Sequence, residues 1–253
     1  MNTLVLNRFK PLSYACTEAM NALCTNLTFA GGKRKVIMFT SCQAGEGKSF
    51  ITMNAMRTFA ELGHRVVLVD ADLRRSQIAS RYGMRITAGN GMGLTHYLAE
   101  MCDAASALYQ TNIPNAWMVP LGRPVTNSLS LLTTPRLSAL LQGLRKQFDY
   151  VLVDAPPVGV IIDAAEIAKH CDGTVIAVRY NNTSRRELSR VKAQIERTDC
   201  PILGVTLNGV SFDSISSKRY YYKNYYARED SGGERRPGSS AQRKKQTARS
   251  SRK

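Results

Sequence analysis

This chain of 253 residues lacks two features that are common in exported and membrane proteins. No apolar run approaches the roughly 18 residues that a membrane-spanning helix needs, and the N-terminal segment lacks the apolar core of a signal peptide. The six cysteines form no CxxC pair, so they indicate neither a zinc site nor a disulfide framework. We therefore expect a cytoplasmic protein with reduced thiols.

Negative charge is also scarce, because 19 acidic residues face 35 basic ones and leave a formal charge of +16. Residues 227–253 hold nine of the basic and three of the acidic residues, and almost nothing apolar. Such a segment cannot bury enough surface to offset its ordering entropy, which predicts a disordered basic tail. The tail has no aromatic residue, so we expect no specific nucleic-acid binding. The rest of the chain is basic too, which indicates a polyanion, a nucleotide or an anionic membrane as a partner.

Short apolar runs alternate with amphipathic stretches along most of the chain. Runs rich in β-branched residues predict strands buried on both faces, at 36–40, 65–70, 117–121, 150–154, 174–180 and 201–208. Helices are expected at about 14–29, 48–62, 135–147, 163–170 and 184–197, the last with a capping box of Ser184 and Glu187. This alternation predicts an α/β fold, a doubly wound and mostly parallel sheet with helices on both faces. Ligands of such sheets bind at the carboxyl ends of the strands, here after residues 40, 70 and 154.

The loop after residue 40 matches the GxGK[ST] end of a P-loop, with Cys42 in place of the usual leading glycine. Glycines let backbone N–H groups curl around phosphate oxygens, and the start of the following helix favours negative charge. Lys48 is expected to reach the β- and γ-phosphates, and the Ser49 hydroxyl to bind Mg²⁺. The predicted nucleotide-binding residues are Gln43, Ala44, Gly45, Glu46, Gly47, Lys48, Ser49 and Phe50.

Two further strands are expected to end in carboxylates. Asp70 and Asp72 stand at i and i+2 at the tip of one strand, so their side chains point to the same side. Beside bound phosphates they imply a metal ion, with one carboxylate free for proton transfer, although solvated residues paired with Arg74 and Arg75 are an alternative. Asp154 closes another apolar strand in the manner of a Walker B carboxylate that holds Mg²⁺.

Near the end of the chain stands a tyrosine cluster, which comprises Tyr220, Tyr221, Tyr222, Tyr225 and Tyr226. A final aromatic strand or an adhesive segment is one interpretation. A set of accessible phosphate acceptors is the other, because buried tyrosines need hydroxyl partners and charged residues flank this run. A phenol with a pKa near 10 is a poor nucleophile at neutral pH, so a kinase must offer it a base, for which Asp70 is the candidate.

The sequences GEGKS (45–49), VVLVDADLRR (66–75), VLVDAPPV (151–158) and the tyrosine cluster resemble, in this order, the bacterial tyrosine kinases (BY-kinases) of capsule and exopolysaccharide systems. The resemblance extends over about residues 15–226 and implies a P-loop NTPase fold that uses ATP and Mg²⁺. It implies that Lys48 contacts phosphates, that Asp70 activates the tyrosine, and that Ser49, Asp72 and Asp154 hold the metal. Neighbouring subunits are expected to phosphorylate one another on the tyrosine cluster.

The resemblance also implies partners. It implies a polytopic membrane activator or chain-length regulator, a cognate tyrosine phosphatase, and a role in polysaccharide polymerisation or export. The chain is then expected in the cytoplasm, held at the inner face of the membrane by its partner. In the family a Glu-x-x-Arg-x-x-Arg pattern mediates ring assembly of the homo-oligomer. Here Glu18 is kept but Asn21 and Cys24 replace both arginines, which puts a standard ring in doubt, and Ser76 replaces a common proline.

The predicted organisation is a kinase domain at 1–219, the tyrosine cluster at 220–226 and the basic tail at 227–253. Two competing functions stay open. A switch ATPase of the Min/Par type would place a second lysine where Gln43 stands and would lack the tyrosine cluster, and both differences count against it. A nucleotide-binding pseudokinase scaffold fits the missing arginines but not the intact Lys48 and aspartates.

Overall fold

The computed structural model describes residues 1–30, 34–160 and 162–210. These belong to one compact unit, Met1–Val210. The predicted domain end at residue 219, the tyrosine cluster and the basic tail lie outside the described residues, so each of them stays a prediction.

A single sheet of nine strands runs through the described part of the chain, in the order β4-β1-β5-β6-β3-β7-β2-β8-β9. The strands are β1 (Thr3–Leu6), β2 (Val36–Ser41), β3 (Val66–Asp70), β4 (Met84–Ala88), β5 (Tyr109–Gln110), β6 (Ala116–Val119), β7 (Tyr150–Asp154), β8 (Gly173–Arg179) and β9 (Ile202–Asn208). All neighbours from β6 to β9 pair in parallel, whereas β5 with β6 and β1 with β4 are antiparallel. The expected mostly parallel sheet is confirmed.

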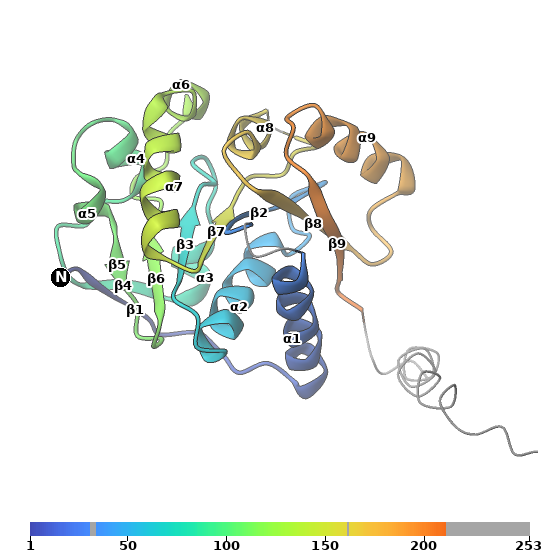
Figure 1. Cartoon of the computed structure of the whole chain (residues 1–253), viewed down its shortest axis with the longest axis horizontal. Helices are drawn as coiled ribbons and strands as arrows, with labels where there is room; N and C mark the ends of the chain where they lie inside the picture. Colours follow the sequence, from blue (N-terminus) through green and yellow to red (C-terminus); the bar gives the residue numbers. More distant parts are fainter. Residues whose placement is uncertain (31–33, 161, 211–253) are drawn as a thin grey trace, which may run out of the picture. The chain divides into compact units, whose positions relative to one another are not determined.

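Helices cover both faces of this sheet (Figure 1). They are α1 (Tyr14–Phe29), α2 (Lys48–Glu61), α3 (Ile78–Tyr82), α4 (Leu94–Leu98), α5 (Ala104–Ala107), α6 (Ser128–Leu132), α7 (Pro135–Gln147), α8 (Asp163–Ala168) and α9 (Arg185–Glu196). Side chains from α1, α2 and α3 share one hydrophobic core with Ile37 and Phe39 of β2. Side chains from the later helices share the other core with Val36 and Met38 of the same strand. Successive residues of a strand thus enter opposite cores, as a doubly wound fold requires.

The expected elements lie within a few residues of the observed ones. The Ser184 hydroxyl accepts a hydrogen bond from the Glu187 N–H at 3.2 Å, and the Ser184 N–H donates to Glu187 Oε2 at 2.9 Å, so the capping box is confirmed. The expectation of burial on both faces is wrong for β9. This strand forms an edge of the sheet, and Val205 and Leu207 are 49% and 54% exposed. None of the helices in the described ranges is long and apolar enough to cross a membrane.

Helix α1 begins after Ser13, whose hydroxyl accepts a hydrogen bond from the Cys16 N–H. Its inner face packs on α2. Cys24 is fully buried there, with its sulfur 3.8 Å from the carbonyl oxygen of Ala55 on α2. Position 24 therefore faces the interior of this chain, whereas Glu18 is exposed. An arginine at position 24 would have to leave this contact to reach a neighbouring subunit.

Candidate active site

The carboxyl ends of three adjacent strands bring the predicted site together. Asp154 at the end of β7 pairs in register with Phe39 of β2 on one side and with Asp70 of β3 on the other. Parallel strands place their carboxyl ends at the same edge of the sheet, so the loops that follow β2, β3 and β7 meet there. This is the edge that the sequence predicted.

The loop from β2 to α2 has the backbone of a phosphate loop. Gly45 and Gly47 have φ values of +83° and +94°, a region that side chains with a Cβ rarely adopt. A Cβ on Gly47 would also lie 1.9 Å from the side-chain nitrogen Nδ2 of Asn208. Helix α2 begins directly at Lys48, so its first N–H groups point to the space in front of the loop.

Lys48 lies between two of the predicted carboxylates. Its Nζ is 2.9 Å from Asp72 Oδ2 and 3.4 Å from Asp154 Oδ2. Burial by itself would lower the pKa of Lys48, but the charges of Asp154 and Asp72 outweigh this and raise that pKa above the usual lysine value. The lysine therefore carries a full positive charge at the phosphate loop at neutral pH.

Asp154 is fully buried, and its hydroxyl partners within the described ranges, Ser49 and Thr52, both lie on α2. Ser49 Oγ donates to Asp154 Oδ2 at 2.5 Å, and Thr52 Oγ1 donates to Oδ1 at 3.3 Å. Burial raises the pKa of Asp154, while the Lys48 charge and the Ser49 hydroxyl oppose this effect. Ser49, Asp72 and Asp154 each have an oxygen within 3.4 Å of Lys48 Nζ, and oxygen atoms are the ligands that Mg²⁺ prefers.

Asp70 has one oxygen engaged and one free. The Ser76 hydroxyl donates to its Oδ2, whereas Oδ1 is buried and has no hydrogen-bond partner among the described residues. Burial, followed by the nearby negative charge of Asp154, raises the pKa of Asp70 to about 7. A carboxyl group that titrates near neutral pH and keeps a free oxygen is suited to accept a proton.

The interpretation of Asp70 and Asp72 as solvated residues paired with arginines is wrong. Both aspartates are buried, and Arg74 turns away to Asp163 at 3.1 Å and to the Ser128 hydroxyl at 2.7 Å. Arg75 contacts Asp72 through its backbone alone among the described residues, with its N–H 3.2 Å from Oδ1.

Sequence reasoning missed a set of residues that hold the phosphate loop from behind. Glu46 is fully buried, and its carboxylate accepts the Gln43 N–H at 2.8 Å and the Thr183 hydroxyl. Asn208 at the end of β9 donates to the Glu46 carbonyl at 2.9 Å. The Gln43 side chain donates to Glu187, a member of the α9 capping box. The contacts with Thr183, Asn208 and Glu187 each join residues more than 130 positions apart, and no local motif signals them.

A cavity of about 450 Å³ opens in front of the loop. It is lined by Ala44, Gly45, Gly47, Lys48, Ser49, Asp72, Arg74, Arg75, Gln77, Arg81, Pro157 and Val160. Of the eight predicted nucleotide-binding residues, Gln43 and Glu46 have side chains that bond elsewhere, and Phe50 packs against the core beneath α1 and α2.

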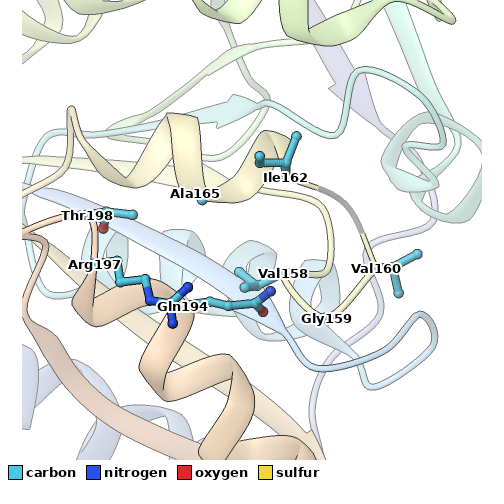
Figure 2. Close-up of a pocket in the computed structure, with 8 residues that line it drawn as sticks. All are labelled: Val158, Gly159, Val160, Ile162, Ala165, Gln194, Arg197 and Thr198. Atoms are coloured by element: carbon cyan, nitrogen blue, oxygen red, sulfur yellow. The ribbon is translucent and has the colours of Figure 1, made fainter.

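A second cavity, of about 330 Å³, lies on the other side of the loop that follows β7. Figure 2 shows Val158 and Val160 on this loop, Ala165 on α8 and Gln194 on α9 around it. Val160 lines both cavities, so this loop separates the space in front of the phosphate loop from the groove between α8 and α9.

Known proteins match this fold and these motifs. A family model described as an AAA domain (AAA_31) matches residues 34–200. The tyrosine-protein kinase CpsD of Streptococcus pneumoniae is 37% identical over 193 residues, which are 76% of this chain and 83% of that protein. The tyrosine-protein kinase YwqD of Bacillus subtilis is 27% identical over 87% of this chain and 90% of its own length.

Solved structures agree. The kinase domain of the Escherichia coli tyrosine kinase ETK superposes with a TM-score of 0.73 at 27% identity, over 78% of this chain and 77% of that chain. The septum site-determining protein MinD of Pyrococcus horikoshii superposes with a TM-score of 0.59 at 22% identity, over 68% and 69% of the two chains, which shows a shared fold. The chain therefore belongs to the bacterial tyrosine-protein kinases of the CpsD and YwqD type, a family of nucleotide-binding AAA domains.

Proposed function

We propose that this kinase transfers the γ-phosphoryl group of ATP to its own tyrosine cluster. The acceptors are Tyr220, Tyr221, Tyr222, Tyr225 and Tyr226. The observation that carries the proposal is the buried Asp70 carboxyl, which keeps one oxygen free and lies beside the phosphate loop. Its pKa of about 7 suits a group that must take a proton from a phenol at neutral pH.

Each residue has one task in this reaction. Asp70 Oδ1 takes the phenolic proton while the tyrosine oxygen forms a bond to the γ-phosphorus. The bond between that phosphorus and the β–γ bridging oxygen breaks, and ADP leaves. Lys48 exchanges its contacts with Asp72 and Asp154 for phosphate oxygens and balances the charge that develops there.

Ser49, Asp72 and Asp154 would hold Mg²⁺. The ion would neutralise the phosphate oxygens and orient them. The described residues contain no group of three or more His, Cys, Asp or Glu side chains that could hold a metal by themselves. Mg²⁺ at nucleotide sites needs just one or two carboxylates, because phosphates and waters complete its shell, so these residues fit the ion.

Several features of the proposed cellular role rest on the family. The chain would act in the polymerisation or export of a capsular polysaccharide or exopolysaccharide. A polytopic membrane protein would activate it and keep it at the inner face of the membrane, and a tyrosine phosphatase would reset it. The chain matches 27% of the length of the Salmonella typhi tyrosine-protein kinase wzc, so most of that relative has no counterpart in the match.

We further propose that one copy of the chain phosphorylates another. This needs an encounter between copies but not the ring that arginines at positions 21 and 24 would support. Asn21 lies half-buried on α1, and Cys24 faces the core. The contact between copies therefore involves other residues or the membrane partner.

A regulatory ATPase is the second candidate, favoured by the fold shared with MinD. Water would then replace tyrosine as the acceptor. The side chain of Gln43, which stands where such ATPases place a second lysine, is bonded to Glu187 of its own chain. This favours the kinase, because a Gln43 side chain bonded within its own subunit does not take the part that the second lysine has in such ATPases.

One assay separates the two functions. The full chain is incubated with Mg-ATP, and phosphotyrosine and free phosphate are measured in parallel. The kinase predicts phosphotyrosine in excess of hydrolysis, and a loss of about 10²–10⁴-fold in its rate for Asp70→Asn. Asp199→Asn is the matched control, since this exposed aspartate has a φ of +59° that asparagine tolerates. Rapid phosphate release without phosphotyrosine would instead support the ATPase.

A further inference from the structure

Two arginines at the cavity in front of the phosphate loop have side chains that the proposed reaction does not use. Arg75 and Arg81 are both exposed and both line the cavity that contains Lys48 and Ser49. Neither forms an ion pair with a carboxylate among the described residues, in contrast to Arg74, which is held by Asp163. Two unpaired guanidinium groups beside a phosphate site are suited to bind a second anion.

The backbone positions of both arginines are fixed. The Arg75 N–H donates to Asp72 Oδ1, and the next residue, Ser76, is tied to Asp72 O at 3.1 Å through its N–H and to Asp70 through its hydroxyl. Arg81 lies on α3, which buries its Ile78 side chain completely. The backbone that follows the proposed base, through the loop and into α3, therefore fixes the Cα positions of both arginines at the cavity.

We propose that Arg75 and Arg81 form a subsite for a phosphotyrosine side chain on the tyrosine cluster of a second copy. The phosphate placed on one tyrosine would then hold the segment while a neighbouring tyrosine reacts. This inference rests on the proposed function, because it concerns the same acceptor segment.

The charge of the segment carries the argument. Residues 214–228 contain four basic residues and no Asp or Glu, so the unmodified segment is repelled by the two arginines. A phosphate adds about 1.5–2 negative charges and three strong acceptor oxygens, which reverses this repulsion. Tyr222 and Tyr225 are three residues apart, at most about 11 Å of extended chain, so both can lie at one cavity and its rim.

Binding of a fluorescent peptide of residues 216–228 tests the subsite. The peptide is prepared unmodified and with phosphate on Tyr225, and its binding to the full chain is measured in Mg-ADP. We expect the phosphopeptide to bind the native chain at least about tenfold more tightly than the unmodified peptide. Arg75→Gln and Arg81→Gln should each remove most of this preference. Lys146→Gln, which removes one charge from the exposed end of α7, should keep it.

Two results overturn the inference. One is a double variant Arg75→Gln/Arg81→Gln that prefers the phosphopeptide over the unmodified peptide as strongly as the native chain does. The other is a loss of ADP affinity in that variant as large as the loss of phosphopeptide affinity, which would assign both arginines to the nucleotide. The binding assay needs no phosphotransfer. A chain that makes no phosphotyrosine but prefers the phosphopeptide would therefore refute the proposed function and retain the subsite.

Discussion

Replacement of Glu46 by alanine tests whether a buried carboxylate gives the phosphate loop its shape. The substitution removes the acceptor of the Gln43 N–H and of the Thr183 hydroxyl. A fully buried donor left without a partner costs about 1–3 kcal/mol. Both donors here are partly buried, so about 1–2 kcal/mol for each predicts a loss of about 2–4 kcal/mol in the free energy of unfolding. Since the N–H groups of this loop would face the phosphates, ADP affinity should fall at least about tenfold.

Two further variants separate the contributions of the individual hydrogen bonds of Glu46. Glu46→Gln keeps the side-chain shape and one acceptor oxygen. Its loss in the free energy of unfolding should therefore be less than half of that of Glu46→Ala. Thr183→Val removes one of the two donors. The double variant Glu46→Ala/Thr183→Val should therefore be less destabilised than the sum of the single variants, by about 1–2 kcal/mol.

Urea unfolding and titration with a fluorescent ADP analogue measure both effects. The reasoning fails if Glu46→Ala unfolds within about 0.5 kcal/mol of the native chain and binds ADP within twofold. Strict additivity of the two substitutions would show that Glu46 and Thr183 act separately.

Two further predictions concern buried positions away from the phosphate loop. His96 Nδ1 accepts the Gly93 N–H at 3.1 Å, and burial, with a smaller effect of Arg123, lowers the pKa of His96. Because the folded state favours the neutral ring, its contribution is present above pH 6.5 and is lost as the pH falls. His96→Asn keeps an acceptor but has no group that titrates. Between pH 7.5 and 5.5, its free energy of unfolding in urea should thus fall less than that of the native chain. An equal fall in both proteins would refute this. Cys24→Arg places a charge in the α1–α2 contact and should lower the free energy of unfolding by more than about 3 kcal/mol. Cys24→Ala should lower it by clearly less. An arginine variant as stable as the native chain would show that position 24 can turn outward.

The parts of the fold that the sequence predicts are those whose cause is local. Buried parallel strands carry continuous β-branched runs, and the capping box of α9 lies within four residues. The phosphate loop is predictable because left-handed glycines and a helix start leave a short motif. The three carboxylates follow from strand ends, since parallel strands place those ends together.

The parts that the sequence did not predict depend on distant contacts. Strands β1 and β4 pair antiparallel at the edge of the sheet, and neither has a long apolar run. The burial of β9 was overestimated because an apolar pattern does not tell an edge strand from a central one. Thr183 and Asn208 support the phosphate loop through single hydrogen bonds to Glu46, which no spacing rule encodes.

The central claim is that one copy of the chain phosphorylates the tyrosine cluster of another. Lys48→Met chain labelled with ¹⁵N is mixed with unlabelled native chain and Mg-ATP, and phosphotyrosine is mapped by mass spectrometry on the heavy peptides. The account predicts phosphate on Tyr220–Tyr226 of the heavy chain, and none when that chain is incubated alone. Phosphate confined to light peptides would contradict transfer between copies, and phosphate on neither would contradict the kinase assignment of the cluster.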